Sequence, residues 1–349
     1  MLLASLRDLQ WRRRRYLIAA IGTALVFAMT LILTGLSNGF DVEAEETVDD
    51  FTVDTWVVKE GAPGPFLGAS PIPAELANGV ADQLGVEAAG PIVVGRKTSG
   101  EPDSLEDVNV FGAEADAPGM PAPSEGRAPT AEGEAMTSTA LAGGVGDEVT
   151  IAGRTFEIVG RVSDSTALAG VPNVFLTLRD AQAVVFSDAP IVSAIAVRGT
   201  PERVPDGLVA LDSSAALDDL LRPLESPRSS ISFVAILLWL VAALIIGSVV
   251  YLSALERVRD FAVFKAVGVP TRSILVGLAL QAAILALFAA VIGIGVGLVL
   301  APVFPMKVVV PSSALLVLPL LAIVVGSIAS AIGMRRVMTV DPALAFGGP

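Results

Sequence analysis

Cysteine and histidine are both absent from this chain of 349 residues. Without cysteine there is no disulfide, thiolate metal site, cysteine nucleophile or iron–sulfur cluster. Without histidine the chain lacks the commonest general base and the commonest transition-metal ligand, which excludes a Ser-His-Asp hydrolase and a zinc enzyme. The pattern G-x-x-x-x-G-K-[ST] is also missing, so the chain carries no P-loop of its own.

Charged residues are scarce as well. They make up 17% of the chain, against about 25% in ordinary soluble domains, while 53% of the residues are hydrophobic. The mean hydropathy of +0.70 indicates membrane spans, but the net charge of −13 requires an acidic polar domain beside them. Because an acidic chain is a poor ligand for nucleic acid, we expect no nucleic-acid partner.

Four windows lack Asp, Glu, Lys and Arg: residues 16–36, 229–255, 273–306 and 308–334. Each can cross a bilayer once, since a span takes about 20 apolar residues. The first is interpreted as a retained anchor, because its apolar run exceeds the ~7–15 residues of a signal peptide. The absence of ionisable groups from the windows argues against an ion-coupled transporter. Gly293 and Gly297 have the spacing of closely packed membrane helices.

Basic residues predict the orientation. They flank the windows on one side of the membrane, so we place both termini and the loop 256–273 in the cytoplasm and residues 41–228 outside, in a multi-pass membrane protein. A membrane-interface group precedes the first window: Trp11, Arg12, Arg13, Arg14 and Arg15. We favour a role for these arginines in orientation alone, and binding of anionic membrane lipids is the alternative.

The predicted fold class is therefore membrane α-helical, with four transmembrane helices and a mixed α/β extracytoplasmic domain inserted between helices 1 and 2. The predicted segments are a cytoplasmic amphipathic helix (1–15), transmembrane helix 1 (16–40), an extracytoplasmic domain of two lobes (41–228), transmembrane helix 2 with a stalk (229–255), a cytoplasmic loop (256–273), transmembrane helix 3 (274–302), a short outer turn (303–312), transmembrane helix 4 (313–334) and a cytoplasmic tail (335–349).

Strand-like and helix-like stretches alternate in the extracytoplasmic segment, which predicts the mixed α/β class. Strands are expected at 52–59, 90–97, 108–112, 148–151, 155–162 and 193–198. Helices are expected at 74–84, 131–142, 178–185 and 213–221. The acidic cluster at its start lacks the spacing of a calcium loop, so we interpret it as a solvated face: Glu43, Glu45, Glu46, Asp49 and Asp50.

The most informative segment is the cytoplasmic stretch 256–274, ERVRDFAVFKAVGVPTRSI. Phe261 and Phe264 are three residues apart and share a helix face. Gly268 is expected to end that helix and Pro270 to prevent its continuation, while Thr271 or Ser273 caps the next helix. We interpret the two phenylalanines as anchors for a pocket on a cytoplasmic partner. The alternative is a solvated loop whose basic residues only orient the chain.

This stretch resembles the coupling loop of the MacB/FtsX-type permeases of ABC transporters, whose pattern runs roughly E-R-x-R-E-[FIL]-[AG]-[VL]-x-[KR]-A-[ILV]-G. The residues that carry the resemblance, with Asp260 where glutamate is usual, are Glu256, Arg257, Arg259, Asp260, Phe261, Phe264, Lys265 and Gly268. The end of the chain, 340–344, is similar to the family's D-P-x-x-A-L ending, although shifted. The phrases at 125–129, 145–149 and 156–160 resemble the MacB extracytoplasmic core domain.

The resemblance implies a permease subunit of a bacterial plasma membrane, with no catalytic, cofactor or metal site of its own. Its implied partners are two copies of a cytoplasmic ABC ATPase, which hold ATP and Mg²⁺, a second permease copy, identical or related, and membrane lipids. Closure of the ATPases would act through the coupling loop on the outer domain, for export or extraction of a substrate. The alternative is an FtsX-like transmitter that controls an extracytoplasmic protein, such as a cell-wall hydrolase, without transport.

Overall fold

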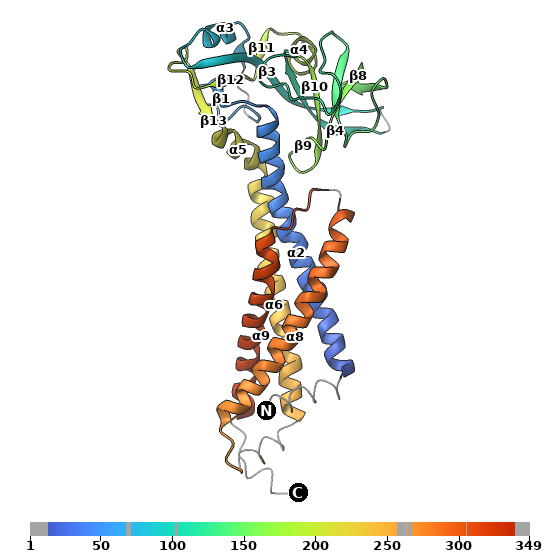
Figure 1. The fold of residues 1–349 in the computed structure, drawn as a ribbon, viewed down its shortest axis with the longest axis vertical. Coiled ribbons are helices and arrows are strands. Elements are labelled where there is room, and N and C mark those ends of the chain that lie inside the picture. Colours follow the sequence, from blue (N-terminus) through green and yellow to red (C-terminus); the bar gives the residue numbers. More distant parts are fainter. Residues whose placement is uncertain are drawn as a thin grey trace. The chain divides into compact units, whose positions relative to one another are not determined.

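The computed structural model describes residues 13–67, 71–101, 104–256, 263, 267–304 and 306–338. The chain divides into two compact units, one of Met1–Gly39 with Pro227–Pro349 and one of Phe40–Ser226 (Figure 1). Both boundaries fall inside helices, namely α2 (Arg13–Asp50) and α6 (Glu225–Glu256). Both chain connections between the units are therefore helical.

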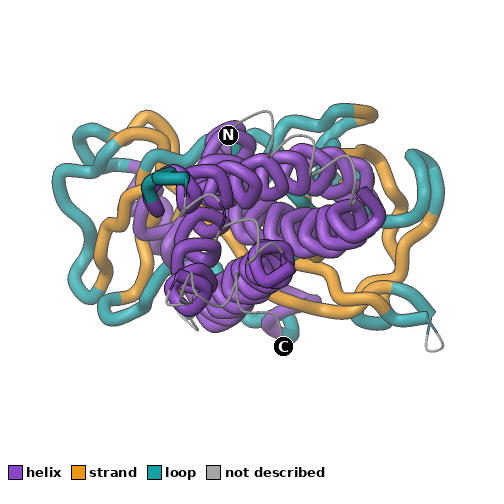
Figure 2. Tube along the Cα trace, turned by 90° about the horizontal axis from the view of Figure 1, so that it is seen from below, coloured by secondary structure: helices purple, strands orange, loops and turns teal. Residues whose placement is uncertain are grey.

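The first unit is a bundle of parts of α2 and α6 with α8 (Thr271–Leu300) and α9 (Ser312–Met338), and η2 (Ala301–Val303) follows α8 (Figure 2). Among the described residues, three helical stretches are long and apolar enough to cross a membrane: Tyr16–Asp50, Ser213–Glu256 and Val276–Val303. A shorter apolar stretch, Ser312–Val325, lies in α9. The helices α2, α6 and α9 extend past the predicted spans at both ends. In particular, α2 continues to Asp50 rather than ending at residue 40, because polar residues extend a helix as well as apolar ones do.

Small residues bring the bundle helices close together. A Cβ added at Gly293 would lie 2.8 Å from the carbonyl oxygen of Ala24 and 2.8 Å from the Cβ of Phe27. One added at Gly297 would lie 3.0 Å from the Cδ2 of Leu31. The predicted close packing at these two glycines is therefore confirmed, and their partner helix is α2.

The segment between α8 and α9 packs along α2 through two further glycines. The backbone N–H of Val309 donates to the carbonyl of Gly35 at 3.0 Å, and the side-chain amide of Asn38 donates to the carbonyl of Val309 at 3.0 Å. A Cβ at Gly39 would lie 1.9 Å from the carbonyl oxygen of Lys307. Glycine at this position thus permits a backbone-to-backbone approach that no side chain would allow.

The second unit is built on a mixed sheet of 11 strands in the order β13-β1-β12-β3-β4-β10-β6-β8-β5, with β7 beside β3 and β8, and β9 beside β10. The strands of this sheet are β1 (Thr55–Lys59), β3 (Val86–Ser99), β4 (Glu106–Ala113), β5 (Glu125–Gly126), β6 (Glu134–Ser138), β7 (Glu148–Ile151), β8 (Arg154–Val162), β9 (Thr166–Ala167), β10 (Val171–Thr177), β12 (Ala194–Gly199) and β13 (Leu208–Asp212). β2 (Ile72–Pro73) and β11 (Ile191–Val192) form a separate pair. The pairs β4–β10 and β6–β8 are parallel.

Both faces of the sheet are covered (Figure 1). In β1, Val57 belongs to one core cluster and Trp56 to the other, as the alternation of side chains along a strand requires. The first cluster includes residues of α3 (Leu76–Ala81) and α4 (Leu178–Phe186). The second includes the end of α2 and α5 (Ser213–Leu221), which is followed by η1 (Arg222–Leu224).

Several predicted elements are confirmed, among them β7, α4 and α5. The helix predicted at 131–142 is wrong, since this stretch contains β6. Its alanines favour a helix locally, but pairing with β8 and β10 in the sheet outweighs that preference. The strands β10 and β13 were not predicted from the sequence. β10 is central and nearly continuously apolar, so it shows no alternation.

Candidate functional site

The coupling segment lies largely outside the described residues, including Arg257, Arg259, Asp260, Phe261, Phe264 and Lys265. Glu256 is the exposed last residue of α6. The backbone N–H of Val267 donates to the carbonyl of Val263 at 3.0 Å, and Gly268 follows with φ of 90°. Glycine suits this left-handed position, where a helix commonly ends.

The start of α8 corrects one expectation. Thr271 or Ser273 was expected as the cap, but the N-cap is Pro270, with extended backbone and no side-chain hydrogen bond. The carbonyl of Pro270 accepts from the N–H of Ser273 at 2.9 Å. Both hydroxyl residues lie inside the helix because it begins at Thr271, directly after the proline.

The membrane-interface group also lies partly outside the description, which omits Trp11 and Arg12. Arg13, Arg14 and Arg15 form the first turn of α2. Directly after them, the hydroxyl of Tyr16 donates to the hydroxyl of Ser253 in α6 at 3.0 Å, and both residues are buried. This link joins two bundle helices that are far apart in sequence, and no local pattern predicted it.

A buried carboxylate overturns the interpretation of the acidic cluster as wholly solvated. Glu43 of α2 is 3% exposed. It accepts hydrogen bonds from the hydroxyl of Thr166 at 2.6 Å and from the backbone N–H groups of Ala169 and Gly170 at 3.0 and 2.8 Å. Leu168, Ala169 and Gly170 all have positive φ, of 57°, 73° and 89°. Successive N–H groups in such a turn form a concave anion site, which here holds a side chain of α2.

Asp219 of α5 is a second buried carboxylate, with no exposed surface. One of its oxygens accepts from the backbone N–H groups of Phe66 and Leu67 at 2.9 and 3.0 Å. A Cβ at Gly64 would lie 2.4 Å from the Cβ of Asp219, so the loop needs glycine there. Asp219 thereby fixes the part of this loop that contains Gly64, Phe66 and Leu67 onto α5.

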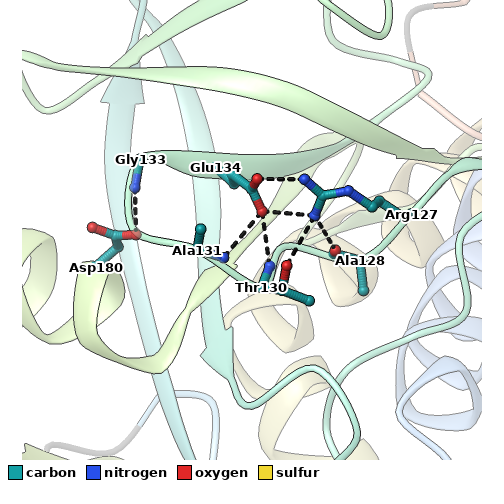
Figure 3. A network of polar contacts seen from close by, with 7 residues as sticks. All are labelled: Arg127, Ala128, Thr130, Ala131, Gly133, Glu134 and Asp180. Carbon is teal, nitrogen blue, oxygen red and sulfur yellow. Dashed lines mark hydrogen bonds and ion pairs between the residues drawn. The ribbon is translucent and has the colours of Figure 1, made fainter.

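A polar network shapes the loop before β6 (Figure 3). The carboxylate of Glu134 forms an ion pair with both terminal nitrogens of Arg127. It also accepts from the backbone N–H groups of Thr130 and Ala131, at 2.9 and 3.1 Å. The hydrogen bond from Arg127 is the main cause that lowers the pKa of Glu134 to about 2, helped by the two backbone donors.

The same loop borders an open groove of about 710 Å³. The backbone N–H of Gly133 donates to Asp180 at 3.0 Å, and Asp180 also accepts from the hydroxyl of the N-cap residue Thr177 (Figure 3 draws the first contact). Charges of both signs line the groove, including the exposed pair Arg179 and Glu132, 2.6 Å apart. No group of three acidic residues in the described part of the chain is placed to hold a metal ion.

Comparison with known proteins resolves the family. A model of the FtsX-like permease C-terminal domain matches residues 232–342, and a model of the MacB-like periplasmic core domain matches residues 17–214. The ABC transporter permease Rv2563 of Mycobacterium tuberculosis is 54% identical over 349 residues, the whole of both chains. The chain belongs to the MacB/FtsX family of ABC transporter permeases. A second M. tuberculosis permease, Rv0072, is 53% identical over 350 residues, again over the whole of both chains.

A solved structure of the periplasmic region of MacB from Actinobacillus actinomycetemcomitans covers 50% of this permease and 94% of its own chain, with 12% identity and a TM-score of 0.35. As a permease of this family, the chain is a multi-pass membrane protein with an extracytoplasmic domain. Membership in the family also implies a partner ATPase.

Proposed function

We propose that this permease couples ATP hydrolysis on a separate cytoplasmic ABC ATPase to motion of its extracytoplasmic domain, and that the motion exports or extracts a substrate at the outer face. The observation that carries the proposal is the continuity of α2 and α6 across the unit boundaries. A helix is a rigid element, so it transmits a displacement from one end to the other, whereas a flexible linker would absorb it. The close contacts of α2 with α8 in the bundle support joint movement of these helices.

The ATPase is proposed to dock on the segment between α6 and α8. This segment follows Glu256 and ends before Thr271, so it joins two bundle helices directly. Phe261 and Phe264 are the proposed anchors, because aromatic residues seated in partner pockets supply much of the energy of an interface. The charged residues of the same segment, from Glu256 to Lys265, would set the register of the partner.

In the proposed assembly two permease copies, identical or related, bind two ATPase subunits. ATP and Mg²⁺ bind to the ATPases and not to this chain, whose sequence contains no P-loop. Both termini face the cytoplasm of a bacterial cell, because basic residues concentrate before the first span, between the second and third spans, and after the fourth.

Co-purification tests the proposal. The tagged permease is extracted from its native membranes in mild detergent, and bound ATPase is identified and assayed. Phe261→Ala is expected to reduce the recovered ATPase about tenfold or more, as expected when an interface anchor is lost. Val263→Ala, which shortens an exposed aliphatic side chain of the same segment, is the matched control.

Full recovery and normal stimulation of the ATPase with both Phe261→Ala and Glu256→Arg would contradict the docking proposal. If the ATPase depends on Phe261 but the complex moves no substrate and retains an extracytoplasmic protein, the FtsX-like alternative replaces export.

A further inference from the structure

Arg161 of β8 is a buried cation with an unused hydrogen-bond donor. The residue is 6% exposed, and its Nη2 donates to the carbonyl of Leu141 at 2.9 Å. Its Nη1 is buried and has no hydrogen-bond partner among the described residues. The ion pairs found in the described part of the chain do not include Arg161 either. Desolvation of a buried cation is costly, so this guanidinium needs a compensating charge.

Thr137 of β6 is a second buried residue whose polar atom has no partner in the part of the chain that the structure describes. It has no exposed surface, and its Oγ1 bonds to nothing there. The parallel pairing of β6 with β8 places Thr137 directly opposite Arg161. Side chains of residues paired in this way lie on the same face of the sheet, on strands about 4.8 Å apart.

The face that carries both groups is the one with the first core cluster. Val174, the partner of Thr137 on β10, belongs to that cluster, as does Leu141, whose carbonyl accepts from Arg161. Two polar groups without partners therefore converge inside an otherwise apolar core, which is where orphaned polar atoms are rare.

The carboxylate nearest in register does not supply the missing charge. Glu125 of β5 is the partner of Arg161 on the other side of β8. Its side chain is exposed to water, and it forms no ion pair with Arg161. The guanidinium bonds instead to Leu141, in the turn that follows β6.

These observations define the chemistry of a ligand. The two groups offer N–H and O–H donors beside a positive charge, which is the environment of an anion. A water molecule, or a direct bond between Arg161 and Thr137, would satisfy the hydrogen bonds but leave the charge uncompensated. Because side chains already cover both groups, the ion must be small and must lose its hydration shell at low cost, as a halide does.

We propose that a chloride ion binds between the guanidinium of Arg161 and the hydroxyl of Thr137 and stabilises the extracytoplasmic domain. The inference concerns this domain alone, so it does not depend on the ATPase docking or the export proposed above.

Thermal unfolding in two salts tests the proposal. Unfolding of the full chain is followed through the fluorescence of Trp56, in the same domain, after Trp11 and Trp239 have been replaced by phenylalanine. Gluconate, which is too large for the site, is exchanged for chloride at constant ionic strength. Tm is expected to rise saturably, by about 3–6 °C once chloride exceeds its Kd about tenfold.

Two variants locate the site. Arg161→Met removes the charge and keeps the length of the side chain. It is expected to abolish the chloride-dependent rise, and in gluconate to unfold at a higher Tm than the unmodified chain because an uncompensated buried charge is gone. Thr137→Val keeps the shape of the side chain and is expected to raise the chloride concentration at half-maximal effect about tenfold. The matched controls are Arg154→Met and Thr155→Val, at exposed positions of β8, which should keep the full rise.

The proposal is overturned if Tm of the unmodified chain is the same in chloride and in gluconate. It is also overturned if Arg161→Met keeps the rise, or if Thr137→Val and Thr155→Val respond to the same chloride concentrations. Should Arg161→Met fail to fold, the comparison of the two threonine variants still decides the outcome.

Discussion

Replacing Glu43 with glutamine is expected to destabilise the extracytoplasmic domain. The carboxylate is buried and accepts from one hydroxyl and two backbone N–H groups of the turn 166–170. Glutamine keeps one of the two acceptor oxygens and turns the other into an NH₂ group. If the oxygen stays toward Thr166 and Gly170, the NH₂ group faces the N–H of Ala169, and two donors then oppose each other.

The expected cost follows from these contacts. Loss of a hydrogen bond to a charged group, with a buried donor left unsatisfied, costs about 1.5–3 kcal/mol. The turn also holds Leu168 and Ala169 at positive φ, a conformation that persists only when its surroundings enforce it. In a unit the size of Phe40–Ser226, about 1 kcal/mol shifts Tm by about 2–4 °C. We therefore expect Tm to fall by about 3–12 °C.

This change is measured by thermal unfolding of the full chain, followed through the fluorescence of Trp56. Trp11→Phe and Trp239→Phe leave Trp56 as the single tryptophan. Trp56 lies in the same core cluster as Ala44 and Val48 of α2. The control is Glu45→Gln, which removes the same charge from an exposed position of the same helix. Equal Tm values for the two variants would refute the structural role of Glu43.

Three further predictions rest on other contacts. The pKa of Glu134 is about 2 in the folded state rather than its usual 4.5, so its contribution to stability is present above pH 4.5 and is lost as pH falls toward 2. When Tm is measured against pH, Glu134→Gln should therefore show a smaller decline over that range than the unmodified chain. An equal decline in the two proteins would contradict this prediction. Gly39→Ala should lower Tm, because its new Cβ meets the backbone of Lys307 and overpacking costs about 1–3 kcal/mol. Gly22→Ala should leave Tm unchanged, because nothing lies within 4 Å of its new Cβ, and equal Tm values for the two variants would argue against the close contact between Gly39 and Lys307. In whole cells, an impermeant maleimide should label Ala122→Cys and not Val267→Cys, both exposed positions, and the opposite pattern would reverse the proposed orientation.

Local patterns were sufficient for some elements and insufficient for others. The helix Ser213–Leu221 has the bounds that were predicted for it. Its start is set locally, since Asp212 caps it and accepts from the N–H of Ala215, three residues away, at 2.9 Å. The stretch 131–142 was wrongly predicted as a helix because its partners in the sheet are distant in sequence. Glu43 was misread for the same reason, since its donors lie 123 to 127 residues further along.

By itself, the sequence determined the membrane class, the inserted polar domain and the family resemblance, because uncharged windows, basic flanks and the coupling-loop pattern are all local in the chain. Only the tertiary structure decided which carboxylates are buried, which glycines permit helix contact, and where the groove beside α4 opens. Each of these depends on segments that meet in space: α2 with the turn 166–170, α8 with α2, and the loop before β6 with α4. Burial and cavity shape arise from such long-range packing, so they cannot be predicted from a short stretch of the sequence.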